Sequence, residues 1–232
     1  MSERNAFSVS LTQKQQRWAL VYFVLTVWLL PTILTFCLEL LFPGASVTLL
    51  NFIWFAVNFL CVVVLFPKFW VASIERLGHD PVRLGIVVCI GLIVYFSLTP
   101  LLSMALIWLR PGFFNVNDNA ISQMFSQNFV LMTVGTVLLV PVAEEFLCRG
   151  FVFGSLYPKN RALAYLLSTV LFCTIHVIRY IRFYDPITLL LCFCQYIPAG
   201  LCLAWVYRTA DNLLAPIFMH AIINALGIFT QR

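Results

Sequence analysis

Four polar side chains suited to hydrolysis lie inside apolar stretches of the second half of the sequence. They are Glu144, His176, His220 and Asn224. A carboxylate beside an imidazole can take a proton from water and make that water a nucleophile. His220 and Asn224 are four residues apart, hence on one face of a helix, where they can donate hydrogen bonds to a developing oxyanion. These residue types predict the hydrolysis of an amide bond.

A zinc site is the alternative interpretation of the same residues. One carboxylate and two imidazoles can bind zinc and leave one position open for water, so Glu144, His176 and His220 are the candidate ligands if a metal is present. The eight cysteines show no CxxC spacing, and a packing role is favoured for them. Cys173 lies three residues before His176, which keeps a thiol mechanism as a minor alternative.

Glu145 and Arg149 form a second polar pair in the same region. They are four residues apart, with the acid N-terminal to the base, which is the favourable order for an ion pair within a helix. Such a pair partly neutralises a buried charge and leaves Glu144 free for chemistry. A purely structural ion pair remains the alternative for Glu145 and Arg149.

The composition of the 232-residue chain decides which elements must position these residues. Hydrophobic residues make up 62% of the chain and charged residues 10%, compared with about 45–50% and about 25% in soluble proteins. A soluble fold of this size could not cover so much apolar surface with so few charges. The composition therefore excludes an ordinary cytosolic domain and predicts an all-α, polytopic membrane helix bundle. No basic run is long enough for a nucleic-acid patch, although the net charge is +5.

Seven apolar runs are close to the roughly 20 residues that cross a bilayer as a helix. They are 18–42 with Pro31 as a kink, 48–66, 84–109, 129–157, 162–178, 187–207 and 213–229. The polar segment 1–17 lacks the pattern of a cleaved signal peptide. It precedes a single transmembrane domain, 18–232, whose catalytic half is about 129–229. Segment 110–128 is predicted to be a surface loop or a short helix lying on the membrane.

The polar groups of three runs fall at similar depth in this arrangement. At about 1.5 Å per residue, Glu144, Glu145, His176, His220 and Asn224 lie about 14–22 Å from the predicted inner surface. The hydrocarbon core is roughly 30 Å thick. Charges at that depth are costly and are rarely accidental. We therefore predict that the fourth, fifth and seventh runs face one another around one polar cavity.

Basic residues indicate the orientation of the bundle. With the N-terminus inside, most Lys and Arg residues fall in the inner segments, and only Arg110, Arg179, Arg182 and Arg232 fall in the outer ones. The bias predicts a cytoplasmic N-terminus and an outer C-terminus, although Arg179 and Arg182 go against it.

Three motifs in the second half resemble one family. The sequence 144–149, EEFLCR, is similar to the EExxxR motif of the CAAX-processing and bacteriocin-processing (CPBP) intramembrane protease family, also called Abi, which includes the Rce1-type prenyl-protein endopeptidases. Residues 172–176 resemble its FxxxH motif and residues 220–224 its HxxxN motif. The resemblance covers 129–229, and the first three runs carry no motif.

The resemblance implies a role for each matching residue. Glu144 is expected to be the general base, with His176 assisting. His220 and Asn224 are expected to stabilise the oxyanion. Glu145 and Arg149 are expected to hold the site together. The family is usually classed with metalloproteases. Its best-understood members look able to activate water through glutamate and histidine without an obvious zinc ligand set, so the resemblance leaves the presence of zinc open.

The resemblance also implies an integral membrane protease that cleaves a membrane-associated peptide or protein. Prenylated CAAX cleavage is typical of the eukaryotic branch. The short chain resembles bacterial members, for which a plasma-membrane location and bacteriocin- or pheromone-related substrates are expected. Two other functions stay open: a non-catalytic membrane immunity or partner protein, and a proton-coupled transporter, since buried Glu and His also build proton relays. The lack of repeated halves counts against the transporter.

Overall fold

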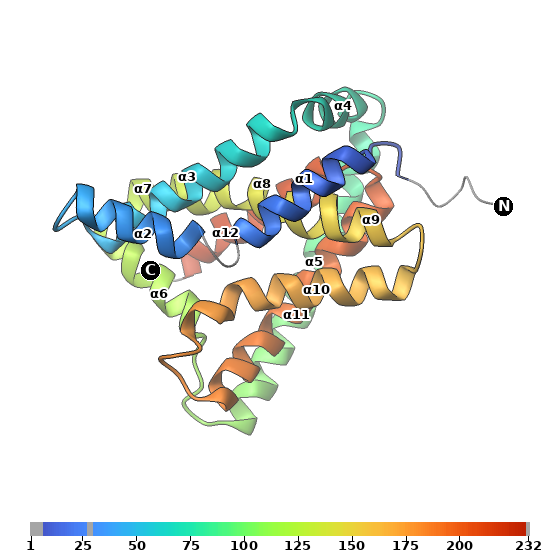
Figure 1. The fold of residues 1–232 in the computed structure, drawn as a ribbon. Coiled ribbons are helices and arrows are strands. Elements are labelled where there is room, and N and C mark those ends of the chain that lie inside the picture. The colour runs from blue at the N-terminus through green and yellow to red at the C-terminus, as the bar shows by residue number, and fades with distance from the viewer. Residues whose placement is uncertain (1–6, 27–29, 231–232) are drawn as a thin grey trace.

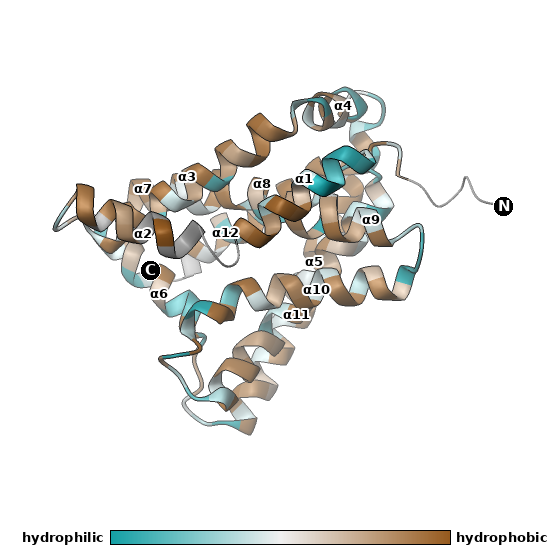
Figure 2. Cartoon of the chain, in the orientation of Figure 1, coloured by the Kyte–Doolittle hydropathy of each residue, from teal (hydrophilic) through white to brown (hydrophobic). Residues whose placement is uncertain are grey.

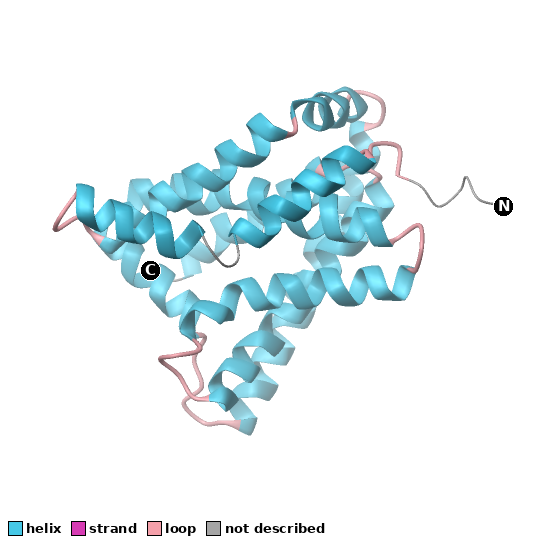
Figure 3. Ribbon diagram, viewed as in Figure 1, coloured by secondary structure: helices cyan, strands magenta, loops and turns pink. Residues whose placement is uncertain are grey.

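The computed structural model describes residues 7–26 and 30–230, and within these residues the chain forms helices and loops but no strand (Figure 3). The helices in chain order are α1 (Gln13–Val24), α2 (Leu30–Leu41), α3 (Val47–Leu65), α4 (Pro67–Leu77), α5 (Pro81–Leu109), α6 (Val116–Gln127), α7 (Phe129–Thr133), η3 (Val134–Leu139), α8 (Val140–Glu145), η4 (Phe146–Phe153), α9 (Gly154–Leu156), α10 (Arg161–Val177), η5 (Ile178–Tyr180), α11 (Pro186–Ala210) and α12 (Leu214–Thr230). The all-α membrane bundle predicted from composition is confirmed.

Five helical stretches of the described chain are long and apolar enough to cross a membrane. They are Val47–Leu65, Pro81–Leu109, Phe129–Leu156, Arg161–Tyr180 and Pro186–Ala210. They correspond to the second to sixth runs predicted from the sequence. Helix α12 corresponds to the seventh run and is apolar but shorter. Hydrophobic residues cover most of these helices, while hydrophilic ones gather at the start of α1, along α4 and at chain turns (Figure 2). The total of seven spans stays a prediction.

The first predicted run, 18–42, contains two described helices, α1 and α2, of 12 residues each. Residues 27–29 between them, just before the predicted kink at Pro31, lie outside the described residues. At the other end, Thr12 and Gln15 form a capping box that starts α1 inside the polar segment 1–17, of which residues 1–6 are not described.

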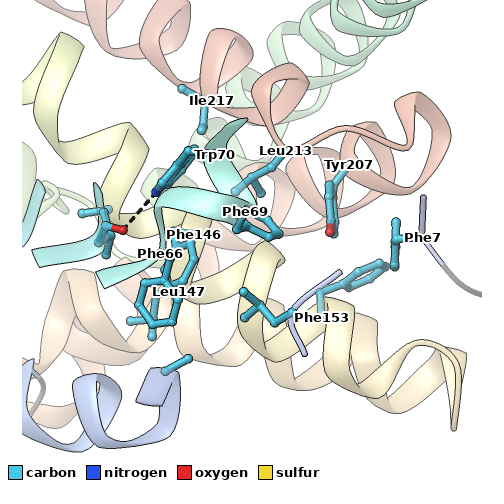
Figure 4. Close-up of a cluster of buried hydrophobic side chains, with 14 of the residues drawn as sticks. Phe7, Phe66, Phe69, Trp70, Phe146, Leu147, Phe153, Tyr207, Leu213 and Ile217 are labelled. Carbon is cyan, nitrogen blue, oxygen red and sulfur yellow. Dashed lines mark hydrogen bonds between the residues drawn. The ribbon is translucent and has the colours of Figure 1, made fainter. Parts of the chain in front are cut away.

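A short helix that was not predicted from the sequence, α4, packs against the helix that carries Glu144 and Glu145. The chain breaks at Phe66, and Pro67 begins α4 at the position proline prefers. Phe66, Phe69 and Trp70 then pack against Phe146 of η4 with ring centroids 4.5, 5.7 and 5.8 Å apart. Figure 4 shows this cluster, in which the Trp70 indole donates a 2.9 Å hydrogen bond to the Val62 carbonyl. The cluster fixes the residue that directly follows Glu144 and Glu145.

The fourth predicted run is one continuous helix, Phe129–Leu156, with two π-helical stretches, η3 and η4. Wide turns of this kind free backbone groups and often occur at functional sites. In η3 the Val140 N–H bonds to the Gly135 carbonyl, and the next residue, Pro141, has no N–H. The Thr136 carbonyl therefore lacks both the α-helical and the π-helical donor that it would use.

Contacts between loops sort the helix ends into two groups. At one end, Asp211 accepts hydrogen bonds from Ser8 and forms a 2.7 Å ion pair with Arg76. At the other end, Arg110 after α5 pairs at 3.0 Å with Asp185, the residue that caps α11. The Arg110 guanidinium and the Thr188 hydroxyl hold the pKa of Asp185 well below its usual range. In the predicted seven-span arrangement, each of these two groups falls on one side of the membrane.

The helices that carry the predicted polar residues lie close together in the bundle. Helix α10 packs against η4 and α9, which continue the helix of α8, while α12 packs against α8, and α11 and α5 run beside each other (Figure 1). Segment 110–128, predicted as a loop or a surface helix, forms helix α6, which Asn115 begins by accepting bonds from the N–H groups of Asn117 and Asp118.

Candidate active site

Glu144, His176, His220 and Asn224 line one cavity of about 620 Å³. They come from α8, α10 and α12, the helices of the fourth, fifth and seventh runs. The wall also includes apolar side chains of α3 and α6, such as Phe55 and Phe125. The structure thus brings together polar groups that are up to 80 residues apart in the sequence.

Glu144 occupies the centre of this polar group. Its Oε2 lies 3.8 Å from His176 Nε2 and 4.0 Å from His220 Nε2. The side chain is one-quarter exposed (25%), yet Oε2 is buried and has no hydrogen-bond partner among the described residues. Both gaps are too long for a direct hydrogen bond and are of the size that one bridging water fills.

His176 is held in one orientation. Its Nδ1 lies 2.7 Å from the Phe172 carbonyl one turn earlier, and because a carbonyl only accepts, Nδ1 must carry a proton. In the neutral ring the Nε2 that faces Glu144 is therefore an acceptor. The rings of Phe172 and Tyr196 pack against the imidazole with centroids 4.6 and 4.3 Å away.

Glu145 and Arg149 form the ion pair that their spacing predicts, with a 2.9 Å contact and no exposure of either side chain. Arg149 also donates to the Gly200 carbonyl of α11 at 2.9 Å and lies 4.6 Å above the Phe172 ring. The same Glu145 Oε1 accepts a 2.8 Å bond from His220 Nδ1. Glu145 therefore orients a catalytic candidate, which spacing alone did not reveal because the two residues are 75 positions apart.

Asn224 makes a contact that differs from its expected role. Its amide donates a 2.8 Å hydrogen bond to the Thr136 carbonyl, the group that η3 and Pro141 leave without a backbone donor. Asn224 therefore satisfies the Thr136 carbonyl and links α12 to η3. Its second amide hydrogen is available to the cavity that Asn224 lines.

The sequence analysis missed a polar cluster behind His176. The Tyr196 hydroxyl lies 2.6 Å from Asp118 Oδ1, 3.2 Å from Asn115 Oδ1 and 3.1 Å from the Asn117 amide. Burial raises the pKa of Asp118, while the hydrogen bond from Tyr196 opposes that rise. The signal for this cluster was the run of polar residues after Phe114, which the sequence analysis placed on the surface.

Gln195, Pro198 and Gly200 of the sixth run serve packing. Gln195 accepts from Asn115 at 3.0 Å and donates to Ser103 at 3.1 Å. At Gly200 an added Cβ would lie 2.7 Å from Thr169 Cγ2 of α10, so the missing side chain lets α10 and α11 approach closely. That approach brings the Gly200 carbonyl to Arg149.

The candidate metal ligands are not grouped as a metal site within the described residues. Within residues 7–26 and 30–230, no three His, Cys, Asp or Glu side chains are grouped so that they could hold a metal ion. The candidate ligands are Glu144, His176 and His220. The Oε2 atom of Glu144 lies 3.8 Å from His176 Nε2 and 4.0 Å from His220 Nε2. Cys148 and Cys173 are buried thiols and neither lines the cavity.

The part of the chain that carries the site is similar to one protein family and to two curated proteins. Residues 126–226 match the family described as type II CAAX prenyl endopeptidase Rce1-like. The chain is 29% identical over 90 residues to the UPF0177 protein YxdF of Lactococcus lactis subsp. lactis (strain IL1403), which covers 39% of this chain and 44% of that protein.

A second relative is the Bacillus subtilis (strain 168) protein named "Putative membrane peptidase YdiL". It is 31% identical over 102 residues, which make up 44% of this chain and 37% of that protein. The match therefore spans less than half the length of either curated relative. No solved structure matches the chain. Glu144, His176, His220 and Asn224 all lie inside residues 126–226.

Proposed function

We propose that this protein is an intramembrane endopeptidase that hydrolyses a peptide bond with a water activated by Glu144 and His176. The match of residues 126–226 to the Rce1-like family and the similarity to the protein named "Putative membrane peptidase YdiL" support this proposal. The observation that carries the proposal is the buried, unpartnered Glu144 Oε2 within 4.0 Å of two imidazoles in one cavity. The substrate is a membrane-associated peptide or protein that enters this cavity.

The first step follows from the hydrogen-bonding capacity of the two side chains. A water between Glu144 Oε2 and His176 Nε2 can donate one hydrogen to each, because both atoms are acceptors when His176 is neutral. Its lone pairs then point away from both and toward a substrate carbonyl carbon. Glu144 takes the proton as the oxygen attacks, which gives a neutral carboxyl group and a tetrahedral oxyanion.

His220 is suited to stabilise that oxyanion. Its Nδ1 is tied to Glu145, so Nε2 is the atom turned to the cavity. The site holds two negative side chains, Glu144 and Glu145, and one positive side chain, Arg149. With a positive charge on His220, the total charge of these four side chains is zero. The His220 Nε2–H then donates to the oxyanion, together with the second hydrogen of the Asn224 amide.

The last step returns the proton. The Glu144 carboxyl group donates it to the amide nitrogen as the carbon–nitrogen bond breaks, and the products are a carboxylic acid and an amine. The atoms and charges of these three steps balance without a metal ion. Treating the purified protein with a chelator and measuring both cleavage and bound zinc tests this part of the proposal separately.

The experiment for the proposed function replaces the base. In purified protein, Glu144→Gln keeps the side-chain volume and removes the proton acceptor, so cleavage of a membrane peptide library should fall by a factor of about 10²–10⁴. Glu75→Gln on α4, at an exposed position, is the matched control and should cleave at the parent rate.

Two outcomes would contradict the proposal. Equal cleavage by Glu144→Gln and the parent would show that Glu144 is not the base. Proton flux into liposomes that depends on Glu144, without any peptide cleavage by the parent, would favour the transporter that the sequence also allows.

A further inference from the structure

The orientation of His176 depends on a tyrosine that the proposed chemistry does not use. The imidazole packs against Tyr196 of α11 at 4.3 Å between ring centroids, with 33° between the ring planes. The Nδ1 contact to the Phe172 carbonyl fixes one atom of the ring, and the Tyr196 ring covers it from the neighbouring helix. Together they direct Nε2 toward Glu144.

The Tyr196 ring is itself fixed at its far end. Its hydroxyl donates to Asp118 Oδ1 at 2.6 Å and accepts from the Asn117 amide at 3.1 Å. Asn115, which begins α6, lies 3.2 Å from the same hydroxyl. Asn117 is held in turn by Tyr180, whose hydroxyl lies 3.3 Å from its Oδ1. Three side chains at the start of α6 thus contact the Tyr196 hydroxyl.

This arrangement is more polar than packing requires. A phenylalanine would cover His176 with the same ring, and an apolar first turn of α6 would spare the cost of burying a carboxylate. The pKa of Asp118 is raised by that burial. The Asp118 carboxylate and the Tyr196 hydroxyl therefore act as an anchor that holds the ring in one plane.

We infer that Tyr196 and Asp118 are positioning residues for His176: the α6 carboxylate fixes the phenol, and the phenol fixes the imidazole plane that faces Glu144. The catalytic part of this inference rests on the proposed function, and the orientation of the ring does not. Helix α6 is thereby part of the active-site framework, although it lies outside the three helices that carry the Glu, His and Asn side chains.

Other charged and titratable groups near His176 come from several elements. Glu144 of α8 faces Nε2, and His220 of α12 shares the same Glu144 oxygen. Arg179, one turn after His176, is turned to α3, where it lies 5.7 Å from the Trp54 ring and 3.4 Å from Asn51. The Tyr196 ring lies directly against the imidazole, so a change at the phenol is expected to act on ring orientation first.

The test observes the imidazole directly by nitrogen-15 NMR in detergent micelles. The chain has only three histidines, and His176→Gln identifies the His176 signals. In the parent, the Nδ1 proton bonded to the Phe172 carbonyl should exchange slowly with solvent. In Tyr196→Phe, which keeps the ring but loses the anchor, that exchange should be about tenfold faster, the equivalent of one lost hydrogen bond.

Three further variants separate anchoring from packing. Asp118→Ala should speed the exchange as Tyr196→Phe does, and the double variant should match either single variant because both remove one link. Asp118→Asn keeps an acceptor oxygen for the phenol and should restore most of the protection. Tyr165→Phe, on α10 in the aromatic cluster away from the cavity, is the control and should match the parent.

The kinetic arm distinguishes this inference from the proposed function. If the protein cleaves peptides, Tyr196→Phe should lower kcat about tenfold with little change in KM, and Asp118→Asn should recover most of it. Unchanged proton exchange in Tyr196→Phe and Asp118→Ala would overturn the inference whether or not peptides are cleaved. Absence of cleavage by the parent would overturn only the proposed function and leave the NMR result to decide the role of Tyr196.

Discussion

At the scale of single residues, Glu144 and Glu145 are adjacent in the chain and have different surroundings. Glu145 is fully buried, and its Oε1 contacts both Arg149 and His220. Glu144 is turned to the cavity and keeps a free oxygen. The difference follows from the angle of about 100° between successive side chains of a helix, which points one carboxylate into the protein and the other into the cavity.

The bond from Asn224 to the Thr136 carbonyl leads to a prediction about stability. Asn224→Ala leaves that buried carbonyl unpaired, which should lower the free energy of unfolding by about 1–3 kcal/mol. Pro141→Ala supplies the N–H that the π-helical turn lacks, so Asn224→Ala should cost less in a Pro141→Ala background. Thermal unfolding in detergent of the parent, both single variants and the double variant measures this coupling.

A role of Asn224 confined to the oxyanion would give another result. In that case Asn224→Ala would slow cleavage with the unfolding temperature unchanged, and Pro141→Ala would have no influence on its effect. The stability measurement needs no substrate, so it stands apart from the proposed function.

At the scale of elements, close approach between helices positions the ion pair at the site. Helices α10 and α11 meet at Gly200, where an added Cβ would lie 2.7 Å from Thr169 Cγ2 and 3.3 Å from its Cα. The backbone atom cannot move aside without shifting α10. Since the Gly200 carbonyl accepts from Arg149, the spacing of the two helices and the support of Glu145 depend on the same residue.

Gly200→Ala should therefore destabilise the bundle, by about 1–3 kcal/mol, the usual cost of overpacking. Gly85→Ala on α5 is the matched control, because nothing lies within 4 Å of its added Cβ. The control should be neutral or gain up to about 1 kcal/mol from the better helix propensity of alanine. Unfolding midpoints in one detergent compare the two, and equal midpoints would contradict the tight contact between α10 and α11.

At the scale of the whole molecule, the loop contacts divide the bundle into two ends. Ser8, Arg76 and Asp211 meet at one end, and Arg110 and Asp185 meet at the other. An odd number of crossings separates Ser8 from Arg110 in the seven-span arrangement, and an even number separates Ser8 from Asp211. The contacts therefore fit the alternation of sides that the sequence analysis proposed.

The orientation leads to a prediction for the intact cell. With a cytoplasmic N-terminus, a reporter enzyme that is active only outside the cytoplasm should be active when fused after Phe183 or after Arg232. It should be inactive when fused after Gly78 or Lys159, because the positive residues of those segments hold them inside. Activity at Gly78 with none at Phe183 would reverse the orientation, and activity at all four sites would contradict the alternation.

How far the sequence predicts the structure depends on whether a feature is local. The apolar runs from 48 onward give helices with boundaries near those expected, because length and hydropathy are properties of one segment. The run 18–42 holds α1 and α2, and its continuity through residues 27–29 stays a prediction because those residues lie outside the described part of the chain. Helix α4 was missed because its 11 residues are too few for a membrane span and follow a proline.

The candidate site shows the same limit. The depth of each polar group along its own helix follows from counting residues, and the structure places Glu144, His176, His220 and Asn224 on one cavity. The pairing of Glu145 with His220 and of Tyr196 with Asp118 joins elements 75 and 78 positions apart. The role of each predicted residue in catalysis stays a prediction.

The sequence by itself determined that the chain is a bundle of membrane helices with acidic, imidazole and amide side chains inside them, because hydropathy and helical spacing act within a segment. Only the tertiary structure decided which partner each polar group has. Glu145 holds His220, Asn224 satisfies Thr136, and Asp118 anchors Tyr196, since a buried polar group must take its hydrogen bonds from whichever helix packing brings within about 3 Å.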